Sequence, residues 1–284
     1  MSFSTREVSQ HSAQPALLFH FYREGKAWYY TNAEQDIVLD GKTYLSTPSS
    51  IGVVVHSGEA TATGAEITIP ATAALAQYLD LVTPTHTISA VIRKLHMTLD
   101  ELDGTYDAPV SLADAPVMWA GVLTGVGRPA PNTRVLQCNN LSVTMTRTGL
   151  RLGWQRTCPH VVYERGCFVD RVSYRTTIAA LTVVNGVQVS APEFAGQPDG
   201  YWKAGYVEWQ IEAGVWERVT VEDHVGNLLT VFGTTQGMAG GSSFRAYPGC
   251  TRTSDVCQSR FANGDNFGGY RMHGKNPFDG NQVF

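Results

Sequence analysis

Four of the chain's five cysteines lie in two close pairs. Eight residues separate Cys158 from Cys167, six separate Cys250 from Cys257, and eighty-two lie between the two pairs. Thiolate sulfur is a ligand for both zinc and iron–sulfur clusters, and both take four of them. The pattern therefore predicts one metal or cluster site that ties the end of the chain back to its middle.

The spacing within each pair bears on which metal is bound. Zinc sites usually place only two to four residues between paired cysteines, because a tight turn presents both sulfurs to one small ion. An iron–sulfur cluster is larger, so ligands on longer loops can reach separate irons. Gaps of eight and six residues favour the cluster and leave zinc, a disulfide pair or unligated buried thiols open.

Basic residues surround both pairs and suit an anionic group. A cluster held by four thiolates is net negative, and nearby guanidinium groups would stabilise it. The residues expected to do so are Arg147, Arg151, Arg156, Arg165, Arg171 and Arg175 near the first pair, and Arg245, Arg252, Arg260, Arg271 and Lys275 near the second.

Other reactive residues suggest weaker hypotheses. Cys138 has no partner in the sequence and sits in a strand-like run, which favours a core thiol. Cys158 and His160 could form a nucleophile and base, although such pairs usually meet through the fold and no third orienting group is evident. His160 could also contact a metal or a cluster sulfur, but a partly exposed loop histidine is the simpler interpretation. The acidic run 100–107 matches a calcium loop poorly and is expected to be a solvated loop.

Composition excludes several classes of protein. The chain of 284 residues has a formal net charge of −4, which argues against specific nucleic-acid binding through phosphates. No apolar run reaches the roughly 18 residues of a membrane helix, and the first residues lack a signal-peptide pattern. We therefore expect synthesis in the cytosol, where structural disulfides are rare, and no membrane insertion. The sequence also lacks a phosphate-binding P-loop and a Gly-x-Ser-x-Gly nucleophile elbow.

Short strands with turn signals between them predict a mainly β fold, either a barrel or a sandwich. Asp40-Gly41 and Asn185-Gly186 are strong hairpin signals. One helix is expected over 70–79, with Pro70 in its first turn, while 141–154 is ambiguous between strand and helix. The expected strands are 16–22, 27–31, 36–39, 43–45, 51–56, 66–69, 87–95, 117–126, 134–139, 177–184, 187–190, 206–211, 215–222 and 228–232.

Tryptophans recur every seven residues at Trp202, Trp209 and Trp216. A helical heptad would show the same spacing, but Gly205, Gly214 and the alternation of polar and apolar residues between them favour strands. We expect these rings in the core or at a subunit contact rather than in a sugar-binding platform.

The sequence resembles the minor tail protein of long-tailed bacteriophages and gene transfer agents, the tail-tip component often called the L-type protein. The spacing Cys-x8-Cys before Cys-x6-Cys carries the resemblance. So does the closing run from Gly249-Cys250 through Asn266-Phe267-Gly268-Gly269. A third, weaker feature is the opening pattern of Ala16–Phe21, Trp28-Tyr29-Tyr30 and Gly41–Tyr44.

The resemblance implies a [4Fe–4S] cluster on Cys158, Cys167, Cys250 and Cys257, together with β-barrel hub domains. The expected division is an N-terminal barrel over 1–146, a discontinuous cysteine domain over 147–176 plus 245–284, and a small barrel inserted at 177–244. In the family form with a shorter middle gap no such insertion is present, so the eighty-two intervening residues are a departure.

The resemblance also implies a structural role in the virion and no enzymatic activity. A homotrimer at the tail tip or baseplate would adapt the tail tube to the central fibre or hub protein, beside the distal tail protein ring and the tape measure protein. Two alternatives remain open: a tail-associated Cys/His cell-wall peptidase using Cys158 and His160, and a zinc-stabilised module that binds a host surface through its tryptophans.

Overall fold

The computed structural model describes residues 7–8, 14–52, 64–99, 106–107, 111–140, 153 and 155–270. The ambiguous stretch 141–154 and the tail after 270 lie almost wholly outside these ranges, as do Asp100, Glu101 and Asp103 of the expected acidic loop. The chain forms two compact units, unit 1 (Met1–Arg147) and unit 2 (Thr148–Phe284). The predicted division of 147–284 into a discontinuous cysteine domain and an inserted barrel stays a prediction.

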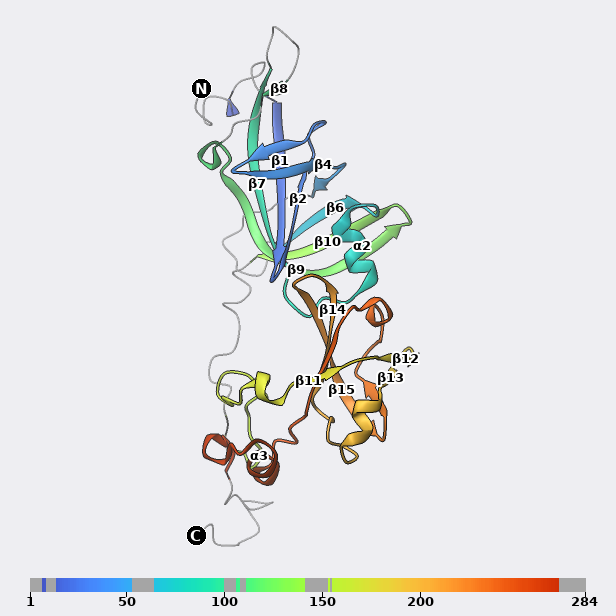
Figure 1. The fold of residues 1–284 in the computed structure, drawn as a ribbon. Coiled ribbons are helices and arrows are strands. Elements are labelled where there is room, and N and C mark those ends of the chain that lie inside the picture. The colour runs from blue at the N-terminus through green and yellow to red at the C-terminus, as the bar shows by residue number, and fades with distance from the viewer. Residues whose placement is uncertain are drawn as a thin grey trace. The chain divides into compact units, whose positions relative to one another are not determined.

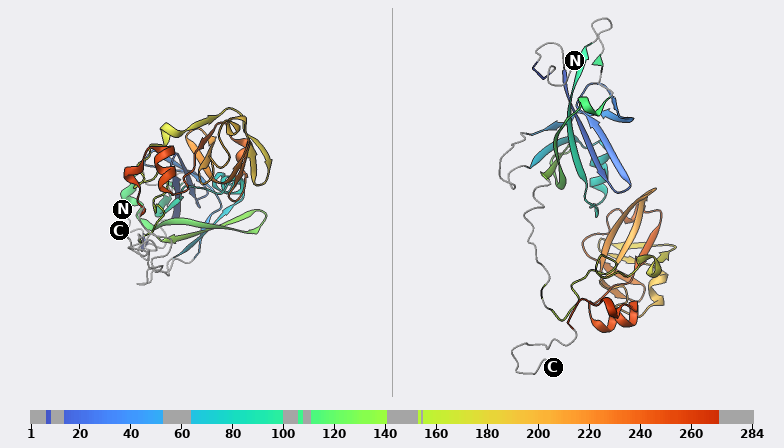
Figure 2. Two further views of the ribbon diagram at one scale, coloured as in Figure 1. Left: turned by 90° about the horizontal axis from the view of Figure 1, so that it is seen from below. Right: turned by 90° about the vertical axis from the view of Figure 1, so that its left-hand side faces the viewer.

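Unit 1 is built on one strongly curled sheet (Figures 1 and 2). Its strand order is β3-β4-β2-β1-β7-β9-β10-β6-β5, and β8 pairs with β7. The strands are β1 Gln14–Arg23, β2 Lys26–Thr31, β3 Ile37–Leu39, β4 Lys42–Ser46, β5 Ser50–Ile51, β6 Ala65–Pro70, β7 Ser89–Leu99, β8 Tyr106–Asp107, β9 Val117–Ala130 and β10 Thr133–Asn140. The helices are α2 Ala74–Leu81 and the 3-10 turn η1 Leu112–Asp114.

The central strand β1 is buried on both faces. Leu18 packs with Ile37, Leu39 and Leu95 in one cluster, on the side covered by β3 and β4. On the alternate positions Phe19 and Phe21 are also fully buried, as the two-residue period of a strand requires. This second face lies toward α2, because Phe21 packs against Tyr30, whose hydroxyl accepts the N–H of Leu75 at 2.9 Å.

The predicted helix is present, but it begins at Ala74 rather than Pro70. Pro70 instead ends β6 and pairs with Thr133 of β10. The next residue, Ala71, donates its N–H to the carbonyl of Asn132 at 2.8 Å. These sheet contacts hold the chain extended past the proline and delay the first helical turn.

Unit 2 contains a seven-stranded antiparallel sheet in the order β11-β17-β14-β15-β16-β13-β12. Its strands are β11 Thr176–Ile178, β12 Thr182–Asn185, β13 Gln188–Ser190, β14 Tyr206–Glu212, β15 Val215–Val225, β16 Leu228–Val231 and β17 Phe244–Tyr247. The helical segments are α3 Ser254–Phe261 and the 3-10 turns η3 Arg171–Tyr174, η4 Pro192–Gly196, η5 Met238–Gly240 and η6 Gly264–Asn266. The cysteine pairs flank this sheet in sequence.

Both hairpin predictions are confirmed. Asp40 and Gly41 adopt φ angles of 51° and 69° between β3 and β4, which is the left-handed geometry of a two-residue hairpin turn. Gly186 and Val187 connect β12 to β13, and Asn185, the last residue of β12, accepts the N–H of Val187 through its side-chain oxygen at 2.9 Å. The mainly β fold is likewise confirmed, since both units are organised around sheets.

Trp209 and Trp216 lie on the strands β14 and β15, and Trp202 lies in the segment that precedes β14, as the alternation predicted. Trp202 and Trp209 are buried, with 1% and 4% of their surfaces exposed. Trp216 lies on β15 beneath the guanidinium of Arg245, whose carbon is 3.7 Å from the ring centroid. Cys138 is a buried core thiol on β10, and burial raises its pKa to about 12. The predicted core roles of Trp202, Trp209 and Cys138 are therefore confirmed.

Candidate metal centre

A backbone contact brings the two cysteine segments together. The N–H of Cys158 donates to the carbonyl oxygen of Arg252 at 2.9 Å. Arg252 has a left-handed φ of 62°, and its own N–H donates to the sulfur of Cys250 at 3.3 Å. Arg252 therefore contacts one cysteine of each pair: its carbonyl oxygen binds Cys158, and its N–H binds Cys250.

The other two cysteines meet at Asn263. Its side-chain nitrogen donates to the carbonyl oxygen of Cys167 at 2.6 Å and lies 3.8 Å from the Cys167 sulfur. Its backbone carbonyl accepts the thiol of Cys257 at 3.2 Å. The contacts at Arg252 and at Asn263 thus each join one cysteine of the first pair to one of the second, and all four cysteines are free thiols.

The pKa of the Cys250 thiol is raised above its usual value. Burial raises the pKa of Cys250 most strongly, and the neighbouring Cys167 and Cys158 raise it further. The N–H of Arg252 and the charge of Arg260 act in the opposite direction. Such a thiol stays protonated without a metal, whereas a bound metal displaces the proton and stabilises the thiolate.

A single tetrahedral ion would need these thiols to lie close together. A zinc ion at about 2.3 Å from each sulfur would hold the sulfurs within about 4 Å of one another. Within the described part of the chain, no group of three or more His, Cys, Asp or Glu side chains is close enough to hold a metal ion. The donor set of four thiols with N–H groups aimed at two of them suits a larger, anionic group.

His160 is held between two glycines. A Cβ atom at Gly166 would lie 2.7 Å from its Nδ1, and one at Gly268 would lie 2.5 Å from its Nε2. The loop that precedes Cys167 and the segment that follows η6 therefore pack directly on the imidazole ring. Next to it, Tyr270 donates its N–H to the carbonyl of Gln155 at 2.8 Å, which holds the two segments together.

The proposed peptidase pair finds no geometric support. Among the described residues, neither the Cys158 thiol nor the imidazole of His160 makes a side-chain hydrogen bond. A nucleophile of this kind needs its base within hydrogen-bonding reach and a third group to orient the base. The adjacency of Cys158 and His160 in the sequence does not create that arrangement here.

Gly249 lies between the end of strand β17 and Cys250, and it is closely packed. A Cβ atom at Gly249 would lie 1.6 Å from the carbonyl oxygen of Lys203, and one at Gly205 would lie 2.1 Å from the carbonyl oxygen of Tyr247. The two backbones therefore approach more closely than any side chain allows. Cys250 follows immediately, so its position is fixed by this contact.

Arg260 and Tyr163 fasten the cysteine segments to the sheet. Arg260, on α3, donates to the carbonyl oxygens of Tyr201 and Gly249 and stacks on the Tyr201 ring at 4.5 Å. Tyr163 donates its hydroxyl to the carbonyl of Pro248 at 2.7 Å. Its ring packs edge-on against Phe261 of α3, so one aromatic residue contacts both segments.

A buried carboxylate adds a further anchor. Glu208, on β14, accepts the hydroxyl of Tyr247 at 3.0 Å and pairs with Arg171 of η3 at 3.5 Å. Burial, followed by the charge of Glu208, raises the pKa of Tyr247 to about 12. The network joins η3, which follows the first cysteine pair, to the centre of the sheet.

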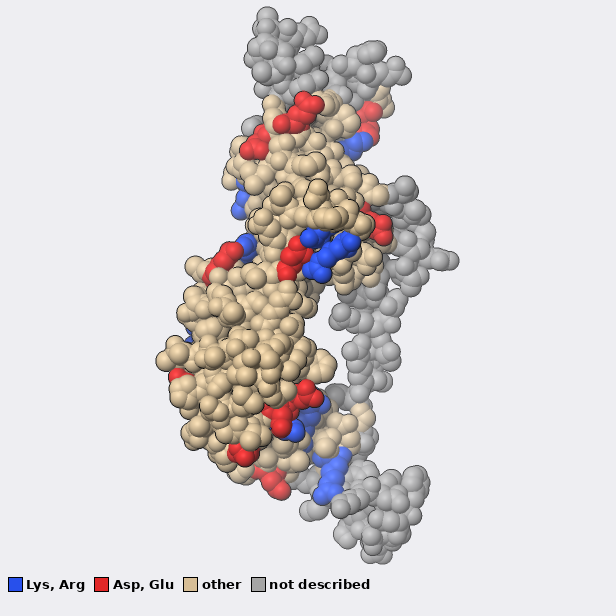
Figure 3. All heavy atoms as spheres, turned by 90° about the vertical axis from the view of Figure 1, so that its right-hand side faces the viewer, with Lys and Arg blue, Asp and Glu red and all other residues tan. Residues whose placement is uncertain are grey.

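The arginines predicted around the cluster have separate roles. Arg171 pairs with Glu208, Arg245 stacks on Trp216, and the charge of Arg260 lowers the pKa of Cys250. Arg147, Arg151, Arg271 and Lys275 lie outside the described residues. On the face drawn in Figure 3, charged side chains of both signs stand in small groups, with no broad basic patch.

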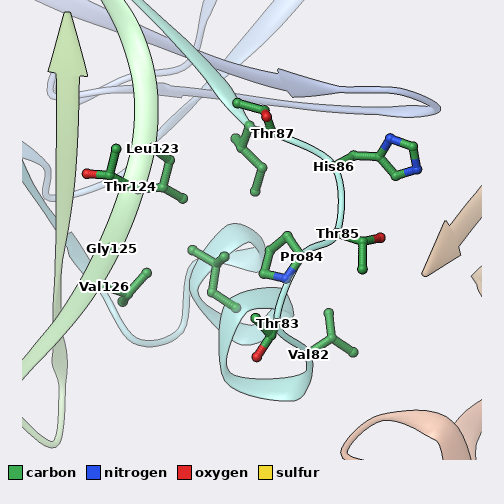
Figure 4. A pocket seen from close by; sticks show the side chains of 12 residues that line it. Val82, Thr83, Pro84, Thr85, His86, Thr87, Leu123, Thr124, Gly125 and Val126 are labelled. Atoms are coloured by element: carbon green, nitrogen blue, oxygen red, sulfur yellow. The ribbon is translucent and has the colours of Figure 1, made fainter. Parts of the chain in front are cut away.

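Unit 1 has a pocket that sequence reasoning missed. It has a volume of about 400 Å³ and lies between the segment that follows α2 and strand β9 (Figure 4). Its walls are mainly apolar, and His86 is its titratable residue. That histidine pairs with the exposed Glu24 at 3.5 Å. The lining residues are Leu79, Val82 to Ile88 and Leu123 to Val126.

Comparison with known proteins gives three findings. Residues 200–276 match the model of a family described as "Phage conserved hypothetical protein BR0599". A protein of Xylella fastidiosa (strain 9a5c), described as uncharacterized, is 34% identical over 70 residues, which are 25% of this chain and 15% of that protein. A chain of a solved structure titled "Virion of native gene transfer agent (GTA) particle" superposes with a TM-score of 0.71 at 18% identity, covering 100% of this chain and 99% of that one.

These likenesses have a definite extent. The family match includes Cys250 and Cys257 but begins after Cys158 and Cys167. The structural likeness spans both units and shows that the fold is shared. No helix in the described ranges is long and apolar enough to cross a membrane.

Proposed function

We propose that this chain is a structural protein of a phage-like virion. The observation that carries the proposal is the end-to-end likeness to a chain of a gene transfer agent particle, at a TM-score of 0.71. The match of residues 200–276 to a phage family supports it independently. Because the two chains are 18% identical, the shared fold makes the shared role a proposal rather than an identification.

Within the virion, the finer assignment is the tail tip or baseplate hub. The resemblance carried by the cysteine spacing and by the Asn-Phe-Gly-Gly run supports it. In this role a homotrimer adapts the tail tube to the central fibre or hub protein and contacts the distal tail protein ring and the tape measure protein. The protein carries out no catalysis in this role.

The cofactor proposed is a [4Fe–4S] cluster held by Cys158, Cys167, Cys250 and Cys257. Its support is the arrangement of contacts that brings one cysteine of each pair to Arg252 and the other two to Asn263. A cluster at this point would be a cross-link between two segments distant in sequence. Residues 262–270 contain few apolar side chains, so burial alone compensates poorly for the conformational entropy that this segment loses on folding. Metal–sulfur bonds would supply the additional stabilisation.

The first experiment tests the cluster. The full chain is purified without oxygen, and iron, acid-labile sulfide and visible absorbance are measured for the wild type and for Cys257→Ser. We expect about four irons per wild-type chain, the number in the proposed cluster, and loss of most of this iron in the variant. Cys138→Ser is the matched control, since Cys138 is a buried thiol of unit 1 outside the site.

The Cys257→Ser variant also tests whether the effect of the cluster is confined to unit 2. If the cluster is a local cross-link, Cys257→Ser leaves the unfolding of unit 1 unchanged and exposes the chain after residue 257 to protease. A colourless, iron-free wild type that still assembles into particles would disprove the cluster but not the virion role.

The second experiment tests the virion role. Particles produced by the strain that encodes this chain are purified, labelled with antibody against the chain and examined by electron microscopy. We expect label at the distal end of the tail and a three-fold projection there. Purified particles without the chain would overturn the structural role, and label along the whole tube would overturn the tip assignment.

A further inference from the structure

We infer that Asn263 is a positioning residue of the cysteine site, where its backbone contacts Cys257 and its side-chain amide donates a hydrogen bond to the Cys167 sulfur. The inference rests on the proposed cluster and extends it to a residue that supplies no ligand. The contacts of Asn263 with Cys167 and Cys257 are what connect one cysteine of each pair.

The side-chain amide of Asn263 has two N–H donors, and Cys167 offers two acceptors. The carbonyl oxygen of Cys167 lies 2.6 Å from Nδ2 and its sulfur lies 3.8 Å from the same atom. The longer contact is weak for a neutral thiol. It strengthens when the sulfur becomes a thiolate, because hydrogen bonds to charged acceptors are shorter and stronger than those to neutral ones.

The amide is fixed in this orientation by its surroundings. Its oxygen, Oδ1, accepts a hydrogen bond from Nδ2 of Asn266 at 2.7 Å. Rotating the amide by 180° would place Oδ1 against the carbonyl oxygen of Cys167 and Nδ2 against another donor, so the network sets the assignment. The nitrogen therefore faces the cysteine.

The backbone of Asn263 is fixed as well. Its N–H donates to the carbonyl of Cys257 at 3.1 Å, after α3 ends at a left-handed Ala262 with φ of 48°. The N–H of the next residue, Gly264, donates to Oε1 of Gln258 at 3.1 Å. Asn263 is thus rigidly attached to the turn that carries Cys257 while its side chain holds Cys167.

A donor at this place has a defined chemical consequence. Hydrogen bonds to cluster sulfurs stabilise the more negative, reduced state and so raise the reduction potential. The backbone N–H of Arg252 makes the equivalent contact to Cys250 at 3.3 Å. Both cysteine pairs therefore have a sulfur that faces an N–H donor, and the donor to Cys167 belongs to a side chain, so a substitution can remove it.

The test uses Asn263→Asp, which keeps the shape and the Oδ1 acceptor but replaces the donor by oxygen. Gln258→Glu is the matched control, because it adds the same charge nearby, on α3, and keeps the acceptor for Gly264. Midpoint potentials of iron-loaded, full-length protein are measured by titration followed by electron paramagnetic resonance. We expect Asn263→Asp to lower the potential by about 59 mV or more, a tenfold change for a one-electron couple, and Gln258→Glu to change it by clearly less.

Asn263→Ala provides a neutral second variant. Without the amide, transfer of iron to a chelator should be at least about fivefold faster than in the wild type. An unchanged potential in Asn263→Asp, or equal shifts in both acidic variants, would overturn the inference while leaving the cluster in place. Failure of both Asn263 variants to fold would make the residue purely structural and also overturn it, and an iron-free wild type would overturn the cluster and the inference together.

Discussion

The carbonyl oxygen of Lys203 occupies the space that a Cβ atom of Gly249 would need, at 1.6 Å from its position. The backbone at Gly249 therefore packs directly against the backbone at Lys203, with no room for a side chain, just before Cys250. This contact explains the glycine that precedes the second cysteine pair, since any side chain there would push the pair away from the sheet.

Gly249→Ala is expected to destabilise unit 2 by about 3 kcal/mol or more, because the partner atom is backbone and cannot rotate away. The measurement is the unfolding transition of unit 2 in the full chain, followed by calorimetry. Gly196→Ala is the control, as a Cβ there meets nothing within 4 Å, and it should leave the transition nearly unchanged. Equal effects of the two substitutions would contradict the close approach.

Gly268→Ala is expected to displace His160, because the new Cβ would lie 2.5 Å from Nε2. Overpacking of this kind typically lowers the free energy of unfolding by about 1–3 kcal/mol. Removing the ring removes the two closest contacts and leaves only Pro159 Cδ at 3.2 Å, so the same substitution should be less harmful in a His160→Ala background. A double-mutant cycle measures this coupling, and additive effects would show that the ring and the glycine do not touch.

Arg260→Lys is expected to loosen α3 from the sheet. A lysine cannot stack as a plane on Tyr201 while donating to the carbonyl oxygens of Tyr201 and Gly249. The loss should be about 1.5–3 kcal/mol, the range for hydrogen bonds to charged groups. Urea unfolding and limited proteolysis of the cysteine segments measure it, with Arg252→Lys as the control. Wild-type protease resistance in Arg260→Lys would rule out this anchoring role.

Asp80 should make unit 1 sensitive to acid. Hydrogen bonds from Arg134, and next from Arg128, lower the pKa of its carboxyl. The unfolded carboxyl takes up its proton near pH 3.9, before the folded one does. The stabilisation is therefore present above about pH 3.9 and is lost as the pH falls through the lowered folded pKa.

Asp80→Asn removes this titration. The difference in melting temperature of unit 1 between the wild type and Asp80→Asn should be largest at neutral pH and should shrink below about pH 4. The exposed carboxyl of Glu34 provides a charge-matched control as Glu34→Gln. A difference that stays constant from neutral to acid pH would contradict the role of the Arg134 pair.

The sequence by itself determined the secondary structure where local chemistry is strong. Asp40-Gly41 and Asn185-Gly186 need left-handed or Asx-turn geometry, and alternation places Val207 and Trp209 on buried positions of β14. The start of α2 was wrong by four residues, because the pairing of Pro70 with Thr133 is a contact between distant segments. Local propensity contains no information about such a partner.

The same limit applies to the candidate site. The type and spacing of the cysteines singled out Cys158, Cys167, Cys250 and Cys257 before any coordinates, since thiols in pairs are rare outside metal or redox sites. Asn263, and the glycines Gly166 and Gly268 that pack on His160, had no such signal. An asparagine or glycine in a polar segment resembles an ordinary turn. Only tertiary structure decided their roles, by bringing segments far apart in the chain within hydrogen-bonding and van der Waals distance.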